Sequence, residues 1–437
     1  MGTKVWKCKA GSFTGHESSG CIHLTGIRYA QSERYSGPEP YIYPDGVHEC
    51  NDPSPYCIQD EARIEGRLIG VWYHEFPQVE SCQFLSVTMP DDVTEDSKLP
   101  VMVWYHGGAF KNGGCENHIY RRHRLSKEQN VIVVGVNYRL SVFGFVKDRD
   151  GNLANNGLLD AIEGLRWVKE NISSFGGDPD NITVFGQSAG AEIVRCMLIS
   201  DITEGLFSRA ILQSVPLGTI PGRRSMDLKV LDELNTYPLD ADPKELIAAQ
   251  RKILSHVTEK SKAKEMVFAP HYGAYPLPDE SEVPERLKKA AAKYPILIGS
   301  NTREVMAYVG GEPRLKRLYR FPLTRWYLKK VVDKATDDVF RVPIRNFADE
   351  YASYGGVTYY YDFHWKEDTF VGSCHGSELA LLFDADGLPL GSDASVGLTA
   401  TEINELGKEF RGVWGGFARD GTISKMSIDG MIKITRL

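Results

Sequence analysis

The stretch from Asn181 to Met197 constrains the fold of this chain more than any other. Residues 182–185 are β-branched, apolar or aromatic, as in a buried parallel strand, and residues 189–197 carry apolar side chains at helical spacing. Between them stands Gly186-Gln187-Ser188-Ala189-Gly190, whose small residues allow a tight turn of the backbone. This G-x-S-x-G pattern between a strand and a helix predicts that Ser188 is a nucleophile in an α/β fold.

Other segments of the chain extend this strand and helix pattern. Short apolar runs predict strands on both sides of the Ser188 turn, and a run with helical periodicity precedes it. Apolar strands alternating with helices predict one α/β domain over residues 1–437, with a mostly parallel central sheet covered by helices on both faces. The predicted strands are 100–105, 131–136, 182–185, 207–213, 295–298 and 357–363, and the predicted helix spans 155–172.

Two helical insertions are predicted, near residues 222–265 and 311–354. Asp242-Pro243-Lys244-Glu245 resembles a capping box with proline at the first helical position. The second insertion is rich in aromatic residues, a pattern more typical of a protein core than of a ligand pocket. Its place between two later strands predicts a cap over the carboxyl edge of the sheet, where ligands of α/β proteins bind. Its aromatic residues are Tyr319, Phe321, Trp326, Tyr327, Phe340, Phe347 and Tyr351.

The composition of the chain argues against several kinds of binding partner. The formal net charge is −7 and the basic residues are scattered, which predicts no nucleic-acid partner. No apolar run reaches the roughly 18 residues of a membrane span, so no membrane partner is predicted. The first residues lack the apolar segment of a signal peptide, which favours a cytoplasmic protein. The eight cysteines lack the spacing of metal sites, so neither a metal nor another cofactor is predicted.

A nucleophilic serine requires a base and an acid that orients this base. In α/β-hydrolases they follow in the order serine, acid, histidine. Four histidines follow Ser188: His256, His271, His364 and His375. His375 lies in a loop after a predicted strand, so we predict it as the base. Glu304 follows the strand 295–298 and is the predicted acid, whereas its rival Asp362 lies inside a strand.

A second candidate feature is His106-Gly107-Gly108-Ala109, which follows the predicted strand 100–105. Small residues at this position leave backbone N–H groups available to stabilise a negatively charged oxygen. A plain glycine turn is the alternative interpretation. The Ala189 N–H, at the start of the predicted helix, is expected to contribute to the same oxyanion hole.

Many motifs in register along the chain resemble those of the type-B carboxylesterases, the cholinesterase-like branch of the α/β-hydrolases. The resemblance spans nearly all 437 residues. The motifs are 26–30 (GIRYA), 80–87 (ESCQFLSV), 103–110 (VWYHGGAF), 137–140 (NYRL), 156–160 (NGLLD), 175–179 (FGGDP), 185–190 (FGQSAG), 299–304 (GSNTRE), 375–379 (HGSEL) and 414–419 (WGGFAR).

The resemblance implies roles for individual residues. It assigns Ser188 as nucleophile, His375 as base and Glu304 as acid. The oxyanion hole would consist of the N–H groups of Gly108, Ala109 and Ala189. The resemblance also implies structural ion pairs between Arg139 and Asp160 and between Arg34 and Glu80, and it aligns Cys57 and Cys82 with a family disulfide.

The predicted function is hydrolysis of a small-molecule carboxylic ester through an acyl-enzyme. Gln187 stands where many relatives have Glu, which makes a cationic choline ester a poorer candidate substrate. The same residues could cleave an amide, carbamate or thioester bond. A different class of function, a non-catalytic adhesion protein, is also known in this family. The sequence leaves the oligomeric state open.

Overall fold

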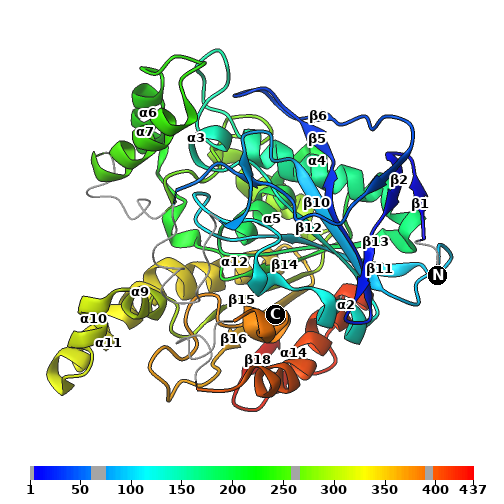
Figure 1. Ribbon diagram of the computed structural model, residues 1–437. Helices are drawn as coiled ribbons and strands as arrows, with labels where there is room; N and C mark the ends of the chain where they lie inside the picture. Colours follow the sequence, from blue (N-terminus) through cyan, green and yellow to red (C-terminus); the bar gives the residue numbers. More distant parts are fainter. Residues whose placement is uncertain (1–3, 61–74, 257–265, 389–396) are drawn as a thin grey trace.

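A sheet of eleven strands runs through the computed structural model (Figure 1), which describes residues 4–60, 75–256, 266–388 and 397–437. Its strand order is β17-β18-β16-β15-β14-β13-β11-β12-β10-β4-β3. The six strands from β16 to β12 are parallel to one another, and the strands on both flanks pair antiparallel. The α/β-hydrolase fold is therefore confirmed, with a parallel centre and antiparallel edges.

The strands of this sheet are β3 (His16–Ser18), β4 (Cys21–Arg28), β10 (Phe84–Pro90), β11 (Leu99–Tyr105), β12 (Ile132–Val136), β13 (Gly177–Gln187), β14 (Arg209–Gln213), β15 (Ile296–Asn301), β16 (Thr358–Phe363), β17 (Ser427–Ile428) and β18 (Ile432–Arg436). Smaller sheets are formed by β1 (Trp6–Cys8), β2 (Gly11–Thr14) and β7 (Val47–Glu49), by β5 (Ala30–Gln31) and β6 (Glu39–Pro40), and by β8 (Tyr56–Cys57) and β9 (Gln78–Val79).

The pleat of the central strands divides the core between the two faces of the sheet. In β11, Val101 and Val103 belong to one hydrophobic cluster, whereas Met102 and Trp104 belong to another. Successive side chains of a strand point to opposite faces, so a strand buried on both sides is apolar throughout. Helices α4, α5, α8 and α12 contribute to the first cluster, and α2, α13 and α14 contribute to the second.

The helices are α2 (His123–Gln129), α3 (Ser141–Gly144), α4 (Asn156–Asn171), α5 (Ala189–Ile199), α6 (Arg224–Leu234), α7 (Pro243–His256), α8 (Val283–Ala291), α9 (Met306–Gly311), α10 (Pro313–Leu318), α11 (Pro322–Thr336), α12 (Val342–Ser353), α13 (Leu379–Leu382) and α14 (Ala400–Asp420). None of the helices in the described ranges is both long enough and apolar enough to cross a membrane.

Helices α6 and α7 occupy the first predicted insertion, of which residues 257–265 lie outside the described ranges. Helix α7 begins at Pro243, and the Asp242 side chain accepts a hydrogen bond from the Lys244 backbone N–H at 2.8 Å. Pro at the first helical position needs no N–H partner, which explains this start.

Helices α9 to α12 occupy the second insertion, and here the expectation of an aromatic core is wrong for half of the segment. Phe340, Phe347 and Tyr351 are buried. Phe321, Trp326 and Tyr327 are exposed. The physical reason is that α10 and α11 extend away from the body of the molecule (Figure 1), so α11 has a packing partner on one side only.

The two ion pairs implied by the resemblance are present. Arg139 Nε and Nη2 each lie 2.7 Å from an Asp160 carboxylate oxygen, and both side chains are buried. Arg34 Nε lies 2.7 Å from Glu80 Oε2 at a half-buried position. Cys57 and Cys82 are buried free thiols, and burial together with the neighbouring Cys57 raises the pKa of the Cys82 thiol.

Candidate active site

The predicted functional residues lie at one edge of the sheet. Ser188 follows β13, the 106–109 loop follows β11, Glu304 follows β15, and the loop with His375 follows β16. These four strands belong to the parallel centre, so their carboxyl ends meet at the same edge. Ligands of open α/β sheets bind at this edge.

Ser188 occupies a sharp turn between β13 and α5. Its backbone has φ 57° and ψ −120°, a conformation that costs free energy for any residue with a side chain. The glycines on either side make the turn possible. A Cβ on Gly190 would lie 1.9 Å from the Tyr105 carbonyl oxygen, and a Cβ on Gly186 would lie 2.4 Å from the backbone of Gly190. The pattern G-x-S-x-G therefore reflects a close approach of three backbone segments at this point.

His375 and Glu304, 71 residues apart in the chain, form a short hydrogen bond. His375 Nδ1 lies 2.6 Å from Glu304 Oε2. The other oxygen, Oε1, accepts the Asn301 backbone N–H at 2.7 Å, and the His375 backbone N–H donates to the Glu304 carbonyl oxygen at 3.1 Å. Glu304 is completely buried. Both oxygens of the carboxylate are thus held, which fixes the imidazole with Nδ1–H as the donor to Glu304.

The other histidines after Ser188 have different surroundings. His271 is buried, with Nε2 2.7 Å from the Phe145 carbonyl oxygen and Nδ1 3.2 Å from Asp227. His364 Nδ1 lies 3.4 Å from the Asp362 carbonyl oxygen, and His256 is exposed on α7. Asp362, the rival acid, accepts a hydrogen bond from the Tyr360 hydroxyl at 3.0 Å. Among the candidate bases and acids, His375 and Glu304 form a direct pair at the carboxyl edge.

Gln187 connects the serine turn with this pair. Its side-chain nitrogen Nε2 lies 3.1 Å from His375 Nε2, the ring nitrogen that faces away from Glu304. Gly107 packs closely against Gln187 and Ser188. A Cβ added to Gly107 would lie 2.8 Å from Gln187 Oε1 and 3.3 Å from Ser188 Cβ. Gln187, Ser188, Gly107 and His375 therefore share one small space. Sequence analysis noted Gln187 as a departure from the family and missed its contact with the imidazole, because that contact joins residues 188 positions apart.

The 106–109 loop carries the backbone groups predicted to bind an oxyanion. Gly108 has φ +117°, where a Cβ would lie 1.9 Å from the Asn112 carbonyl oxygen, and Ala109 has φ 53°. The N–H groups of Gly108, Ala109 and Ala189 donate no hydrogen bond within the described ranges. The helix dipole of α5 places partial positive charge at Ala189. The loop and the helix start thus present unused donors beside Ser188.

His106, the first residue of this loop, is buried and holds the loop through contacts with Gly107 and Tyr138. Burial lowers the pKa of His106 to about 4, so the ring is neutral at pH 7. Nδ1 lies 2.9 Å from the Gly107 carbonyl oxygen, and the ring stacks on Tyr138 with centroids 4.6 Å apart. The Tyr138 hydroxyl donates to the His106 carbonyl oxygen at 2.6 Å. These contacts hold the loop in place without adding a charge.

A second buried carboxyl group, Glu378, lies behind the Glu304–His375 pair. Asn301 Nδ2 donates to Glu378 Oε2 at 2.6 Å, and Gln213 Nε2 donates to Oε1 at 3.3 Å. Burial and, secondarily, the charge of Glu304 raise the pKa of Glu378 to about 7. The sequence places Glu378 only within the 375–379 motif and does not predict a role for it. The burial of its carboxyl group, which singles it out, is visible only in the structure.

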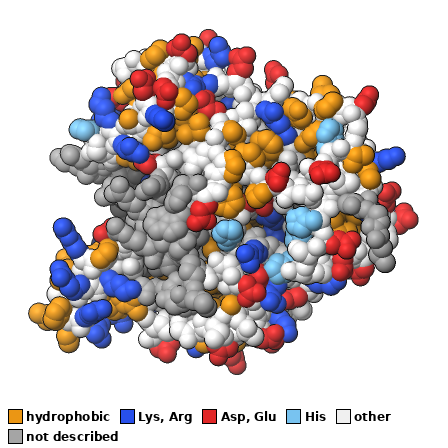
Figure 2. Space-filling model, viewed as in Figure 1, with side chains coloured by type: hydrophobic (Ala, Val, Ile, Leu, Met, Phe, Trp, Pro, Cys, Tyr) orange, Lys and Arg blue, Asp and Glu red, His pale blue; other side chains and the backbone are white. Residues whose placement is uncertain are grey.

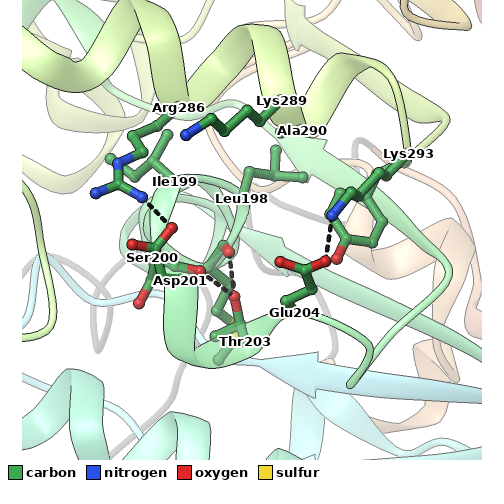
Figure 3. Close-up of a pocket in the computed structure, with 12 residues that line it drawn as sticks. Leu198, Ile199, Ser200, Asp201, Thr203, Glu204, Arg286, Lys289, Ala290 and Lys293 are labelled. Carbon is green, nitrogen blue, oxygen red and sulfur yellow. Dashed lines mark hydrogen bonds and ion pairs between the residues drawn. The ribbon is translucent and has the colours of Figure 1, made fainter.

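The pocket in Figure 3 lies elsewhere, between the end of α5 and α8, and it has a volume of about 50 Å³. Arg286 and Lys293 from α8 and the turn after it pair there with Asp201 and Glu204. Paired charges in so small a space make this a surface ion-pair cluster, not a substrate site. Within the described ranges, no three His, Cys, Asp or Glu side chains are placed to hold a metal ion.

The amino-acid sequence matches known proteins over most of its length. A family model described as "Carboxylesterase family" matches residues 3–313 and 324–430. A Rhodococcus erythropolis protein named "Probable N-octanoylanthranilate hydrolase" is 34% identical over 433 residues, which cover 97% of this chain and 92% of the relative. The para-nitrobenzyl esterase of Bacillus subtilis is 30% identical over 460 residues, covering 96% of this chain and 90% of the relative.

Solved structures of esterases share the fold. A PNB esterase structure superposes with a TM-score of 0.81 at 28% identity and covers 100% of this chain and 97% of its own. A Geobacillus stearothermophilus carboxylesterase superposes with a TM-score of 0.76 at 28% identity and covers 97% of this chain and 92% of its own. The similarity therefore extends over both the sheet and the loops at its carboxyl edge.

Proposed function

The chain belongs to the carboxylesterase family and is a carboxylic ester hydrolase, and we propose that it acts through an acyl-enzyme on Ser188. The observation that carries the proposal is the 2.6 Å hydrogen bond between His375 Nδ1 and the buried Glu304, beside a serine held at φ 57°. A nucleophile, a base and an orienting acid in this chain order are the requirements of serine hydrolysis.

In the proposed mechanism, Ser188 Oγ attacks the carbonyl carbon of the ester and His375 Nε2 accepts its proton. Glu304 keeps Nδ1–H pointed at itself, so Nε2 carries the lone pair that the reaction needs. Collapse of the tetrahedral intermediate breaks the bond to the alkoxy oxygen, and the imidazolium returns the proton to this leaving alcohol. Water then attacks the acyl-serine by the same route, releases the acid and regenerates the Ser188 hydroxyl.

The N–H groups of Gly108, Ala109 and Ala189 stabilise the negative charge on the former carbonyl oxygen. They belong to backbone held in fixed conformations by the 106–112 loop and by α5, so no reorganisation is needed when the charge appears. Loss of one such donor lowers turnover by about 10²- to 10³-fold in serine hydrolases.

The test of the proposal combines active-site labelling with turnover. Wild-type protein is treated with a fluorophosphonate probe and with p-nitrophenyl esters of increasing acyl length, alongside Ser188→Ala. We expect the probe to label Ser188, located by peptide mass spectrometry, and we expect Ser188→Ala to lose labelling and at least about 10³-fold in kcat. The acyl-length profile then measures the size of the acyl pocket.

Matched histidine variants test the base. His375→Ala is expected to abolish turnover, whereas His364→Ala, one of the rival positions, is expected to retain it. A matched p-nitroanilide belongs in the panel because one relative is named for an N-octanoyl substrate. Turnover that survives Ser188→Ala in folded protein would contradict the proposal. A wild type that neither labels nor turns over any substrate would favour a binding protein instead.

A further inference from the structure

The hairpin formed by α10 and α11, residues 313–336, differs in charge from the rest of the chain. It contains eight Lys or Arg residues and one Asp, whereas the whole chain has a net charge of −7. The basic residues are Arg314, Lys316, Arg317, Arg320, Arg325, Lys329, Lys330 and Lys334. In Figure 2 the protrusion at the lower left carries blue side chains next to orange ones. An anionic surface would be attracted to this part of an otherwise acidic protein.

Helix α11 also turns its large apolar side chains outward. Leu323 is 81% exposed, Tyr327 62% and Trp326 56%. These positions, with Lys330 and Lys334, recur at intervals of three and four residues and therefore lie on one face of the helix. Its buried residues are Val332 and Thr336, on the opposite side. An exposed helix face that combines Leu, Trp and Tyr with Lys is typical of helices that lie in the interface of a lipid bilayer.

The end of α10 and the loop before α11 also carry exposed apolar side chains. Leu318, the last residue of α10, is 44% exposed and Phe321 in the loop is 60% exposed, and α10 has no buried residue. Lys330 Nζ lies 4.1 Å from the Trp326 ring centroid, so a cation and an indole are presented together. Tryptophan and lysine side chains place an apolar body in the lipid and a polar end at the headgroups. The hairpin thus carries both parts of an interfacial anchor.

A basic cleft of about 490 Å³ lies on the other side of α11, because Arg325 and Lys329 in its lining share a side of the helix with Val332. Five cations line it, among them Arg320 and Lys329 from the hairpin and Arg303 from the loop before α9. Glu367 and Asp368 also line the cleft, and the Glu367 carbonyl oxygen accepts a hydrogen bond from Arg303 Nη1 at 3.2 Å. The excess of cations adds to the positive potential of the hairpin, which attracts an anionic surface.

The family match covers part of the hairpin. It stops at residue 313 and resumes at residue 324, so residues 314–323 lie outside it, whereas Trp326 and Lys330 lie inside it.

We propose that the α10–α11 hairpin docks on the surface of an anionic phospholipid bilayer, with Phe321, Leu323 and Trp326 at the headgroup level and the surrounding Lys and Arg on the phosphates. The enzyme binds peripherally and does not span the membrane. No membrane partner was predicted because no apolar run is long enough to span a bilayer, and that criterion does not detect a helix that lies in the interface.

Two other occupants fit the hairpin less well. A two-fold contact with a second copy would place the same positive patches against each other, because both subunits use the same surface in such a dimer. A nucleic acid would attract the cations, but Leu318, Leu323 and Val331 would gain nothing from its phosphates and grooves. The charge favours an anionic partner, and the exposed aliphatic side chains favour a lipid.

Co-sedimentation with vesicles tests the proposal. The 437-residue chain is mixed with vesicles of phosphatidylcholine alone or of phosphatidylcholine with phosphatidylglycerol, at low and high salt. We expect binding to the anionic vesicles that weakens as salt rises, and little binding to phosphatidylcholine alone. Inorganic phosphate is added as a competitor at constant ionic strength, and it should not displace protein held by a bilayer.

Three double variants separate charge from apolar contact. Lys329→Glu/Lys330→Glu and Leu323→Gln/Trp326→Gln change exposed positions of α11 and retain residues with good helix propensity. Each is expected to weaken vesicle binding by roughly tenfold or more. Lys288→Glu/Lys289→Glu, at exposed positions of α8, makes the same change in net charge elsewhere and should bind nearly as wild type.

Turnover of a soluble short-chain p-nitrophenyl ester is measured in every variant and is expected to stay within about twofold of wild type. This readout separates failure of docking from failure of hydrolysis. Several results would overturn the proposal: no salt-sensitive binding to anionic vesicles, equal binding by all three variants, or displacement by phosphate. So would a dimer in sedimentation velocity that only the hairpin variants disperse, or tight binding of DNA without binding of vesicles.

Discussion

Gln187 donates its amide to His375 Nε2, the nitrogen that would accept the serine proton in the proposed mechanism. With Nε2 of the amide 3.1 Å from Nε2 of the imidazole, the side chain binds the lone pair that must accept the Ser188 proton. The amide is neutral, so it solvates this lone pair without adding charge, and in the proposed mechanism Ser188 acts as the donor when its proton is transferred. Gln187 is in this sense a positioning residue, since it acts through His375.

A carboxylate at position 187 is expected to shift the pH dependence of turnover. In Gln187→Glu, a negative charge next to the ring favours the protonated imidazole. The acid limb of the kcat/KM profile should therefore move to higher pH by about one unit. Gln187→Met, similar in length and uncharged, is the control that removes the amide without adding charge. An acid limb that stays in place in Gln187→Glu would contradict this role.

Glu378 is expected to make the stability of the protein fall as pH rises toward neutrality. Its pKa is raised from 4.5 to about 7 in the folded chain, so the folded state binds more protons than the unfolded state between these values. Stability then decreases through this window, by about 3 kcal/mol in total.

Urea denaturation of Glu378→Gln at a series of pH values checks this expectation. The variant should lose the decline between about pH 4.5 and 7 and should be more stable than wild type above pH 7. Glu280→Gln, at an exposed position, serves as the control. Parallel pH profiles for wild type and Glu378→Gln would show that Glu378 does not titrate in this range.

At the scale of the elements, the buried Arg139–Asp160 pair joins the loop after β12 to α4. Asp160 also accepts the Arg139 backbone N–H at 3.0 Å, and Arg139 Nη1 donates to the Ser36 carbonyl oxygen at 2.7 Å. Asp160→Asn leaves a buried guanidinium without its counter-charge. We expect a loss of about 3–5 kcal/mol in the free energy of unfolding, measured by chemical denaturation.

The control for this prediction is an ion pair of similar length at the surface. Lys169 Nζ lies 2.9 Å from Asp180, whose side chain is 88% exposed. Asp180→Asn should change stability by less than about 1 kcal/mol, because water already solvates both charges. Equal losses from Asp160→Asn and Asp180→Asn would mean that burial does not control the strength of these pairs.

Sequence reasoning predicted those elements whose local pattern is sufficient. Strands β11, β12, β14 and β16 and helix α4 lie within one or two residues of the predicted ranges, because burial on both faces makes the composition of central strands unambiguous. The predicted ranges 182–185 and 295–298 are too short, since β13 begins five residues earlier and β15 ends three residues later. The pairing of Glu304 with His375 followed from chain order. The exposure of Trp326 and the contact of Gln187 with the imidazole did not follow, since both depend on which distant segments pack nearby.

For the whole molecule, the separation of charge predicts unusual behaviour at charged surfaces. At pH 7 the protein carries −7 overall, yet the hairpin presents eight cations on one protrusion. We expect retention on a cation-exchange resin at low salt, although net charge alone predicts none. Lys329→Glu/Lys330→Glu should elute earlier than Lys288→Glu/Lys289→Glu, which has the same net charge. Wild type that passes straight through would contradict the expectation.

The hairpin is hydrogen-bonded to both sequence neighbours of Glu304, Arg303 and Val305. Arg303 Nη2 donates to the Tyr319 hydroxyl at 3.1 Å, and the Val305 N–H donates to Thr336 Oγ1 at 3.3 Å. A chimaera that exchanges this insertion for that of another esterase would therefore disturb Glu304, the proposed acid, if its junctions fell outside Tyr319 and Thr336. Junctions placed between Arg320 and Lys334 retain both hydrogen bonds, and the residues between the junctions can then be exchanged.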